Sequence, residues 1–184
     1  MFKAFVDLPV YSIVLICIAA GIVFLWLFST LLAIIFANIF GHKIKSGNKA
    51  INLLLKQRYE TSKSMLEMLK KAGQKVDKNW IEIINKFDHI SDFQKIEKSK
   101  RDSMVLDFVH ISHSLFILLN DNKEKFDSEE YRILRENYNE LEDVYRQKSA
   151  VYNADVIGYN YWVRVWYARF LFLMFKKRPK DLIV

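Results

Sequence analysis

The side chains best suited to chemistry lie in one short stretch. His110 and His113 are three residues apart, and Asp107 lies three residues before His110. On a helix this spacing puts Asp107, His110 and either His113 or Ser114 on one face, an arrangement that can hold a metal ion. A metal-dependent enzyme is therefore one hypothesis for this chain.

The surroundings of these histidines favour a different interpretation. Phe108, Ile111 and Leu115 form an apolar stripe beside them, no Glu-x-x-His repeat occurs, and His89 stands alone. These surroundings are typical of histidines at the boundary between the buried and exposed faces of a helix. The sequence has no glycine-rich phosphate loop, no Ser-His-Asp motif and no cysteine cluster. We expect no catalytic site, no cofactor and no metal.

The elements that position these residues begin with a long apolar run. Residues 8–41 contain no Asp, Glu, Lys, Arg or His, a stretch of about 34 residues. A bilayer core of roughly 30 Å needs about 20 helical residues, so we predict a membrane anchor at 8–41, after a short external N-terminus at 1–7. The h-region of a cleaved signal peptide is shorter, about 7–15 residues.

The single cysteine invites one other interpretation of this run. Lipid-modified cysteines normally follow a small residue, but Cys17 follows Ile16. We expect Cys17 to be an apolar filler.

The basic residues predict the orientation of the anchor. Lys43, Lys45 and Lys49 follow it closely, whereas Lys3 alone precedes it. Short segments rich in Lys and Arg stay in the cytoplasm, which puts residues 42–184 there and the N-terminus outside. The net charge is +7, and a second basic cluster lies at 176–180. Both clusters adjoin apolar sequence, which favours the lipid bilayer as the anionic partner over nucleic acid.

The remainder of the chain predicts an all-α fold. The two prolines of the whole chain, Pro9 and Pro179, lie near its ends, and the alternation typical of strands is absent. We expect an N-terminal transmembrane helix followed by an antiparallel three-to-four-helix bundle with long helices. Residues 41–48 either interrupt the chain or are a weak point in one continuous helix. A turn at 72–77, with Asp77 as a helix cap, and a loop at 120–128 then separate three long helices.

The last of these helices, roughly residues 128–175, has the most regular pattern. Every seventh residue is aromatic or leucine: Tyr131, Tyr138, Tyr145, Tyr152, Tyr159, Trp166 and Leu173. A companion seam is formed by Leu134 and Leu141 and later by Val156, Val163 and Phe170. A sustained seven-residue repeat keeps one stripe of a helix against its partners, so we interpret this stripe as bundle core and coiled-coil-like packing.

One motif in this helix resembles a known family. Tyr152-Asn153, Val156 and Tyr159-Asn160 match the repeated Tyr-Asn signature of the LemA family. Leu141-Glu142-Asp143 and Phe175-Lys176-Lys177-Arg178-Pro179 are similar to the segments that flank it. The resemblance implies a helical bundle behind an N-terminal anchor in the bacterial inner (cytoplasmic) membrane, and it implies no enzymatic activity. Some relatives are associated with bacterial organelle membranes, which implies a role in membrane organisation.

The chain also departs from the family pattern. Ser149 stands where the family usually has Arg, and the Leu-Ile-Pro-Asn-Leu segment has its nearest match at 76–80. The Phe-Pro that follows the second Tyr-Asn is replaced by 164–167. The chain therefore resembles a divergent member. We interpret the Tyr-Asn pairs as residues that set the bundle register, with partner binding as the alternative.

Residues 161–180 predict a membrane-proximal segment. It is apolar on nearly every side and then basic, which suits the headgroup boundary. The residues expected at the interface are Trp162, Trp166, Arg169, Phe170, Lys176, Lys177 and Arg178. A straight helix over 8–41 would be about 50 Å long, so either it tilts strongly or residues 33–41 leave the bilayer still apolar. In the second case we expect residues 162–175 to cover them.

These observations lead to two further function hypotheses. The first is a self-associating, non-enzymatic homo-oligomer that organises or shapes the inner membrane, which includes membrane remodelling. The second is a membrane-tethered adaptor that recruits a cytoplasmic protein partner, with residues 181–184 as a candidate site.

Overall fold

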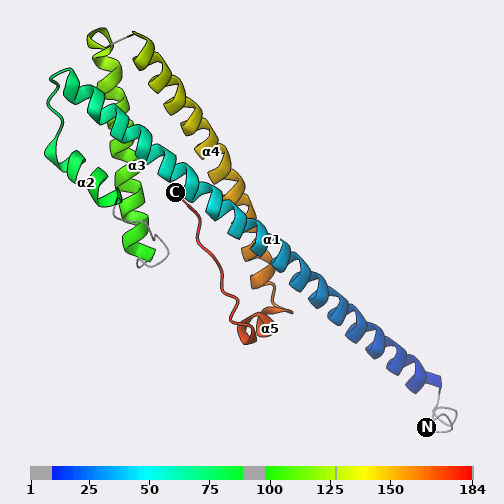
Figure 1. Cartoon of the computed structure of the whole chain (residues 1–184). Helices are drawn as coiled ribbons and strands as arrows, with labels where there is room; N and C mark the ends of the chain where they lie inside the picture. Colours follow the sequence, from blue (N-terminus) through cyan, green and yellow to red (C-terminus); the bar gives the residue numbers. More distant parts are fainter. Residues whose placement is uncertain (1–9, 89–97, 127, 184) are drawn as a thin grey trace. The chain divides into compact units, whose positions relative to one another are not determined.

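The structure of this protein is a computed structural model that describes residues 10–88, 98–126 and 128–183. Its helices are α1 (Val10–Lys71), α2 (Lys78–Asp88), α3 (Lys98–Asp121), α4 (Ser128–Arg164) and α5 (Arg169–Met174), with a 3-10 turn, η2, at Lys123–Lys125 (Figure 1). No strand occurs in these ranges. The predicted all-α fold is confirmed, and the long apolar N-terminal helix packs against further long helices.

The chain divides into two compact units. Unit 1 consists of Met1–Ser46 and Tyr152–Ile183, and unit 2 consists of Gly47–Val151. Helices α1 and α4 each contribute to both units because each is long. The sequence-based division at residue 41 follows the expected membrane boundary, whereas this division follows the packing of side chains.

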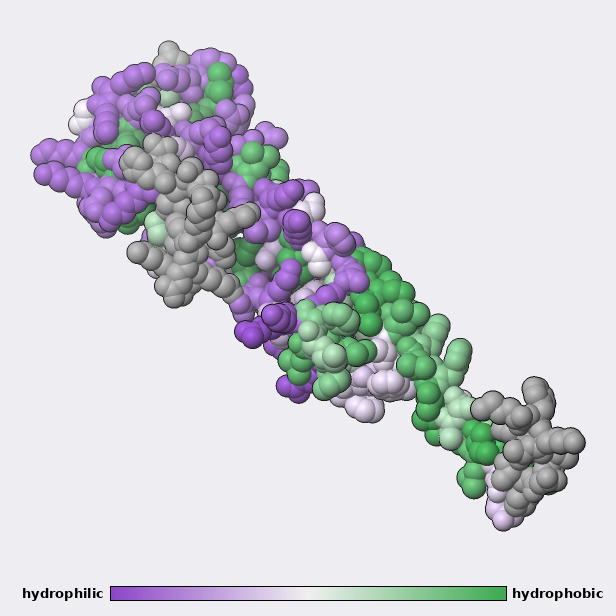
Figure 2. All heavy atoms as spheres, turned by 60° about the horizontal axis from the view of Figure 1, so that its bottom comes forward, coloured by the Kyte–Doolittle hydropathy of each residue, from purple (hydrophilic) through white to green (hydrophobic). Residues whose placement is uncertain are grey.

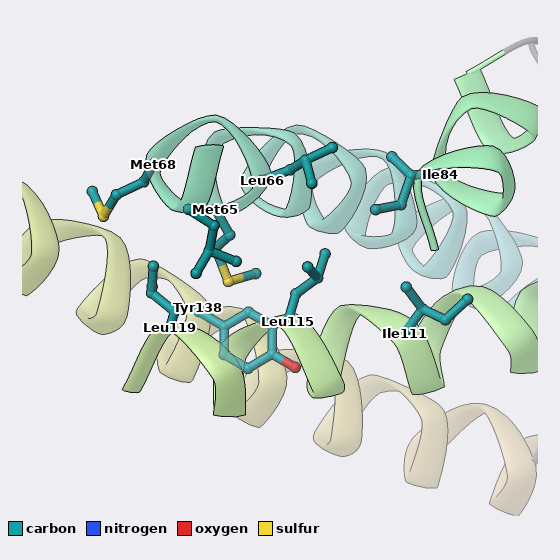
Figure 3. Close-up of a cluster of buried hydrophobic side chains, with 9 residues drawn as sticks. Met65, Leu66, Met68, Ile84, Ile111, Leu115, Leu119 and Tyr138 are labelled. Carbon is teal, nitrogen blue, oxygen red and sulfur yellow. The ribbon is translucent and has the colours of Figure 1, made fainter. Parts of the chain in front are cut away.

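Unit 2 is a helical bundle around one apolar core. Helices α1, α2 and α3 supply most of the buried side chains, and α4 supplies Tyr138. Figure 3 shows these side chains pointing into a shared interior: Met65, Leu66, Met68, Ile84, Ile111, Leu115, Leu119 and Tyr138. Within this unit each helix reverses the direction of the one before it (Figure 1). The expected antiparallel arrangement is thus present in this unit.

Local sequence explains the reversal after α1. Gly73 adopts a positive φ of 70°, a conformation that glycine reaches without steric cost. The N–H of Gln74 bonds the carbonyl of Leu69, and the N–H of Gly73 bonds the carbonyl of Lys70, which together form a Schellman cap. The side chain of Asp77 then accepts the N–H of Asn79 at 2.8 Å and caps α2, as the sequence predicted.

At three places the expected limits of the helices can be compared with the structure. Residues 41–48 do not interrupt α1, which is helical from Val10 to Lys71. We expected one helix between the turn at 72–77 and the loop at 120–128. This prediction is wrong, because the structure has two helices in that range, α2 and α3. The segment that joins them, with His89, and the expected external residues 1–7 lie outside the described residues.

Candidate functional site

The N-terminal part of α1 presents apolar side chains on all sides. From Val10 to Leu31 the large hydrophobic residues are mostly exposed, Phe24 at 66% and Leu25 at 62%. Figure 2 shows this part of the helix as a nearly continuous hydrophobic surface. A water-soluble helix buries at least one apolar face, so this surface needs an apolar environment. Helix α1 is long and apolar enough to cross a membrane.

Helix α3 passes the same test of length and composition over Asp102–Asp121. Its character is nevertheless different, because its buried face belongs to the core of unit 2. Phe108, Leu115 and Leu119 are each 0% exposed, and Ser112 beside them takes part in a polar network. We therefore treat α3 as a core helix.

Beyond residue 32 one face of α1 is covered by the C-terminal part of the chain. Ala33, Ala37 and Ile44 form one buried cluster with Val156, Tyr159 and Val163 of α4 and with Ala168 and Phe172. Ala33 and Ala37 are 0% exposed, and their small side chains let the partner helix approach closely. Phe36 stacks on Trp162 with ring centroids 4.8 Å apart. The structure thus brings residues 33–41 and 162–175 together, as the sequence predicted.

The predicted single helix over 128–175 is wrong at its end. Helix α4 stops at Arg164, a turn follows, and α5 begins at Arg169. The turn lets Ala168 and Phe172 pack back on α1, which a straight continuation of α4 would not allow. The heptad stripe is therefore interrupted: Tyr159 is buried, whereas Trp166 is 83% exposed. Phe170 of the companion seam and Leu173 of the stripe are likewise exposed.

Large apolar side chains are exposed on α5 and directly beside it. They are Trp166, Phe170, Leu173, Met174 and Phe175, all more than 60% exposed. We call these five residues the α5 face. Basic side chains border it: Arg169, Lys176 and Arg178 are exposed, and Lys177 donates a hydrogen bond to Asn38 of α1. Lys177 Nζ also lies 5.9 Å from the ring centroid of Phe172.

The two asparagines of the Tyr-Asn pairs share one role that the sequence did not reveal. Each amide forms two hydrogen bonds with the main chain of one residue in the C-terminal segment, Lys176–Ile183. Asn160 Nδ2 donates to the carbonyl of Lys180 at 2.6 Å, and its Oδ1 accepts the Lys180 N–H at 2.7 Å. Asn153 makes the same pair of bonds with Ile183, both at 2.8 Å.

The side chain of Lys180 is seated on the tyrosine stripe. Its Nζ lies 5.1 Å from the ring centroid of Tyr159, a cation–π contact. Burial lowers the pKa of Lys180 and raises the pKa of Tyr159, since both charged forms lose water. The C-terminal segment is therefore held by main-chain bonds and by this side chain.

Unit 2 contains a buried arginine that the sequence did not single out. Arg58 is 1% exposed. It donates to Ser112 Oγ and Tyr138 Oη, each at 3.2 Å, and forms an ion pair with Glu142. Ser62 donates to Ser112 at 2.9 Å. The sequence does contain a signal for this network, because Arg58 falls on a row of buried residues of α1 spaced three or four apart. The row consists of Ile51, Leu55, Arg58, Ser62, Met65 and Leu69.

Two tyrosines of the stripe complete this network. The guanidinium of Arg58 lies 5.7 Å from the ring centroid of Tyr138 and 5.4 Å from that of Tyr145. Burial raises the pKa of both phenols, and the positive charge of Arg58 opposes that shift in part. The network has the features of a structural polar core.

The other predicted site residues are placed as follows. Asp107, His110 and His113 are exposed on α3, and Ser114 donates to the carbonyl of His110 at 3.1 Å. Among the described residues no group of three His, Cys, Asp or Glu side chains is arranged to hold a metal. Lys43, Lys45 and Lys49 are exposed on α1, where Lys43 and Lys45 flank Ile44 of the cluster of unit 1.

The chain matches no protein-family model, no curated protein and no solved structure.

Proposed function

We propose that this protein is a non-enzymatic, single-pass membrane protein that self-associates and shapes or organises the bacterial inner membrane. The observation that carries the proposal is the α5 face, held beside the point where α1 becomes covered by protein. The resemblance to the LemA family is part of the proposal. Its support is that both Tyr-Asn asparagines, Asn153 and Asn160, play the same structural role.

The length of α1 indicates the depth at which the α5 face lies. At 1.5 Å per residue, Val10 to Thr30 spans about 30 Å, the thickness of the hydrocarbon core. The first buried residues of α1, Thr30, Ala33 and Ala37, come at the end of that distance. Since Ala33 and Ala37 pack on Ala168 and Phe172, the α5 face lies at the level of the headgroups. The lysines at 43, 45 and 49 put this level on the cytoplasmic side.

An aromatic face at that level acts as a wedge. Full burial of one large apolar side chain is worth roughly 1.5–3 kcal/mol, so the α5 face favours insertion into the boundary between headgroups and acyl chains. The bordering cations, Arg169, Lys176 and Arg178, attract anionic headgroups. A wedge inserted in one leaflet expands that leaflet, and several copies side by side would bend or stiffen the bilayer.

The alternative adaptor function has less support. It requires residues 181–184 to be available to a partner, but the main chain of Ile183 is bound to Asn153. The third hypothesis, a metal-dependent enzyme, receives no support from the exposed, separate positions of the histidines on α3.

The test is to reconstitute the full chain into anionic vesicles. We expect deformed vesicles by electron microscopy, and quenching of tryptophan fluorescence by lipids labelled at shallow depth. The double variant Phe170→Ser/Leu173→Ser should stay membrane-bound through α1 but lose at least half of the deformation. A matched control is Ile133→Ser, which alters an exposed apolar residue in unit 2. Undeformed vesicles containing a strictly monomeric wild-type protein would contradict the proposal.

A further inference from the structure

A small cavity of unit 1 is lined by four positively charged side chains. They come from three parts of the chain: Arg164 ends α4, Arg169 begins α5, and Lys177 and Arg178 follow α5. The cavity has a volume of about 290 Å³, close to the lower limit of roughly 300 Å³ for ligand pockets. Its size therefore suits one small polar group. We call this cavity the basic pocket.

No acidic side chain balances the charge of the basic pocket. Asp155 and Asp181 are the only acids in the described part of unit 1, and neither lines the pocket. None of the four lining cations forms an ion pair with another described residue. Like charges repel one another, and a cavity lined by one sign of charge concentrates ions of the opposite sign. The basic pocket is therefore complementary to an anion.

The main chain beside the pocket is held in place by hydrogen bonds. The N–H of Lys177 bonds the carbonyl of Phe172 at 2.9 Å, as part of the cap that ends α5. A few residues later, the side chain of Asn160 holds the main chain of Lys180. Arg178 lies between these two fixed points of the chain. A ligand of the pocket therefore needs to order little of the main chain when it binds.

The other walls of the basic pocket are apolar and continue into the α5 face. Phe172 and Leu173 line the pocket, and Leu173 is also part of the α5 face. Phe172 belongs to the same buried cluster as Ala33 and Ala37 of α1, which the proposed function puts at the level of the headgroups. Apolar walls offer nothing to a hydrated free phosphate, but they match the glycerol and acyl chains attached to the phosphate of a lipid. These walls therefore favour a phospholipid over a free anion.

We propose that the basic pocket binds the phosphate of one anionic glycerophospholipid, whose acyl chains lie against the α5 face. The inference rests on the proposed function for the depth of the pocket. It differs from a general attraction of headgroups because it predicts one lipid at one fixed site. The guanidinium groups of Arg164 and Arg178 can each donate paired N–H groups to phosphate oxygens. A choline headgroup would bring its own positive charge toward these cations, so a zwitterionic lipid should bind more weakly.

The test measures the lipid that stays bound to the full chain in detergent, by native mass spectrometry. The protein is supplied with equal amounts of phosphatidylglycerol and phosphatidylcholine that have the same acyl chains. We expect one retained phosphatidylglycerol per chain and at least about tenfold less phosphatidylcholine. Equal retention of the two lipids would overturn the proposal.

Three variants locate the bound lipid. Arg164→Gln/Arg178→Gln removes two charges from the pocket and should lower the retained phosphatidylglycerol at least about tenfold. Arg164→Lys/Arg178→Lys restores the charges without the paired donors and should recover part of the loss. The matched control, Lys45→Gln/Lys49→Gln, removes two exposed charges of α1 outside the pocket and should leave retention unchanged. An equal loss in the control would identify diffuse attraction and overturn the site. All four positions are exposed, so circular dichroism should show the helix content of the wild type in every variant.

Two further outcomes separate the lipid from a free anion and this inference from the proposed function. Displacement of the lipid by inorganic phosphate, but not by chloride at the same ionic strength, would assign the pocket to the free anion and overturn the lipid. Undeformed vesicles together with one retained phosphatidylglycerol would overturn the proposed function and support the pocket. Deformed vesicles, with retention unchanged in Arg164→Gln/Arg178→Gln, would support the proposed function and overturn the pocket.

Discussion

The buried ion pair of unit 2 gives a quantitative prediction. Replacing Glu142 by Gln leaves the charge of Arg58 in the bundle core without its carboxylate. Arg58 is 1% exposed, so bulk water cannot replace the lost carboxylate. Breaking a buried pair costs about 3–5 kcal/mol. The side chain of Glu142 is 29% exposed, which reduces the expected loss for Glu142→Gln to about 2–3 kcal/mol.

Removal of the arginine in place of the carboxylate should lower the free energy of unfolding by less. Arg58→Met removes the buried charge and keeps an apolar side chain of similar length, while Glu142 is exposed enough to be hydrated. Ser112 and Tyr138 lose one donor each, and Ser112 still accepts a hydrogen bond from Ser62. We expect about 1–2 kcal/mol for this variant. The double variant Arg58→Met/Glu142→Gln should be close to Arg58→Met alone, which is a coupling energy of roughly 2 kcal/mol.

The assay is urea denaturation of the full chain in mild detergent, followed by circular dichroism. Glu142→Gln should lower the midpoint, and by thermal denaturation it should lower Tm by roughly 5–10 °C. The matched control is Glu140→Gln, an exposed position two residues away on α4, which should be within about 0.5 kcal/mol of wild type. Single-variant losses that simply add in the double variant would refute the view of one coupled network.

Two other predictions test packing and titration. A Cβ at Gly158 would lie 2.7 Å from the ring of Phe40, so Gly158→Ala should destabilise unit 1 by about 1 kcal/mol, and adding Phe40→Leu should relieve the clash. At Gly41 a Cβ would lie 3.8 Å from its nearest neighbour, so Gly41→Ala should stabilise the protein by up to about 1 kcal/mol in the same denaturation assay. Burial raises the pKa of the Tyr138 phenol. The contribution of the protonated phenol to stability is therefore complete below about pH 10 and is lost as the pH rises through the pKa of the folded state. Tyr138→Phe should therefore reduce the loss of stability at alkaline pH, and late tyrosinate absorbance in the wild type but not the variant would identify the group.

The fold was predictable because long helices leave strong periodic signals. The seven-residue repeat placed Tyr138, Tyr145 and Tyr159 in the interior, and all three are buried. The same repeat failed at Trp166 because a sequence period does not report where a helix turns. Burial of Phe172 against α1 depends on a contact between residues more than a hundred positions apart. A local pattern contains no information on such a contact.

The role of Asn153 and Asn160 was harder to predict for a related reason. Their neighbours on α4 show that they border the tyrosine stripe, and the sequence analysis interpreted them as register residues. Their partners are main-chain groups of residues 20 and 30 positions later. Main-chain groups are the same in every residue, so no side-chain pattern marks the segment that binds. The resemblance to a repeated Tyr-Asn signature was the only indication that the two positions act together.

The use of tyrosine in place of leucine along the stripe now has a physical reason. In unit 2 the rings of Tyr138 and Tyr145 lie under the guanidinium of Arg58, and in unit 1 the ring of Tyr159 lies under the ammonium of Lys180. Leucine would fill the same volume, but it has no π face to stabilise a cation that has lost water. One periodic residue type therefore builds the core in both units and also accepts the two cations, one of which belongs to the segment held by Asn153 and Asn160.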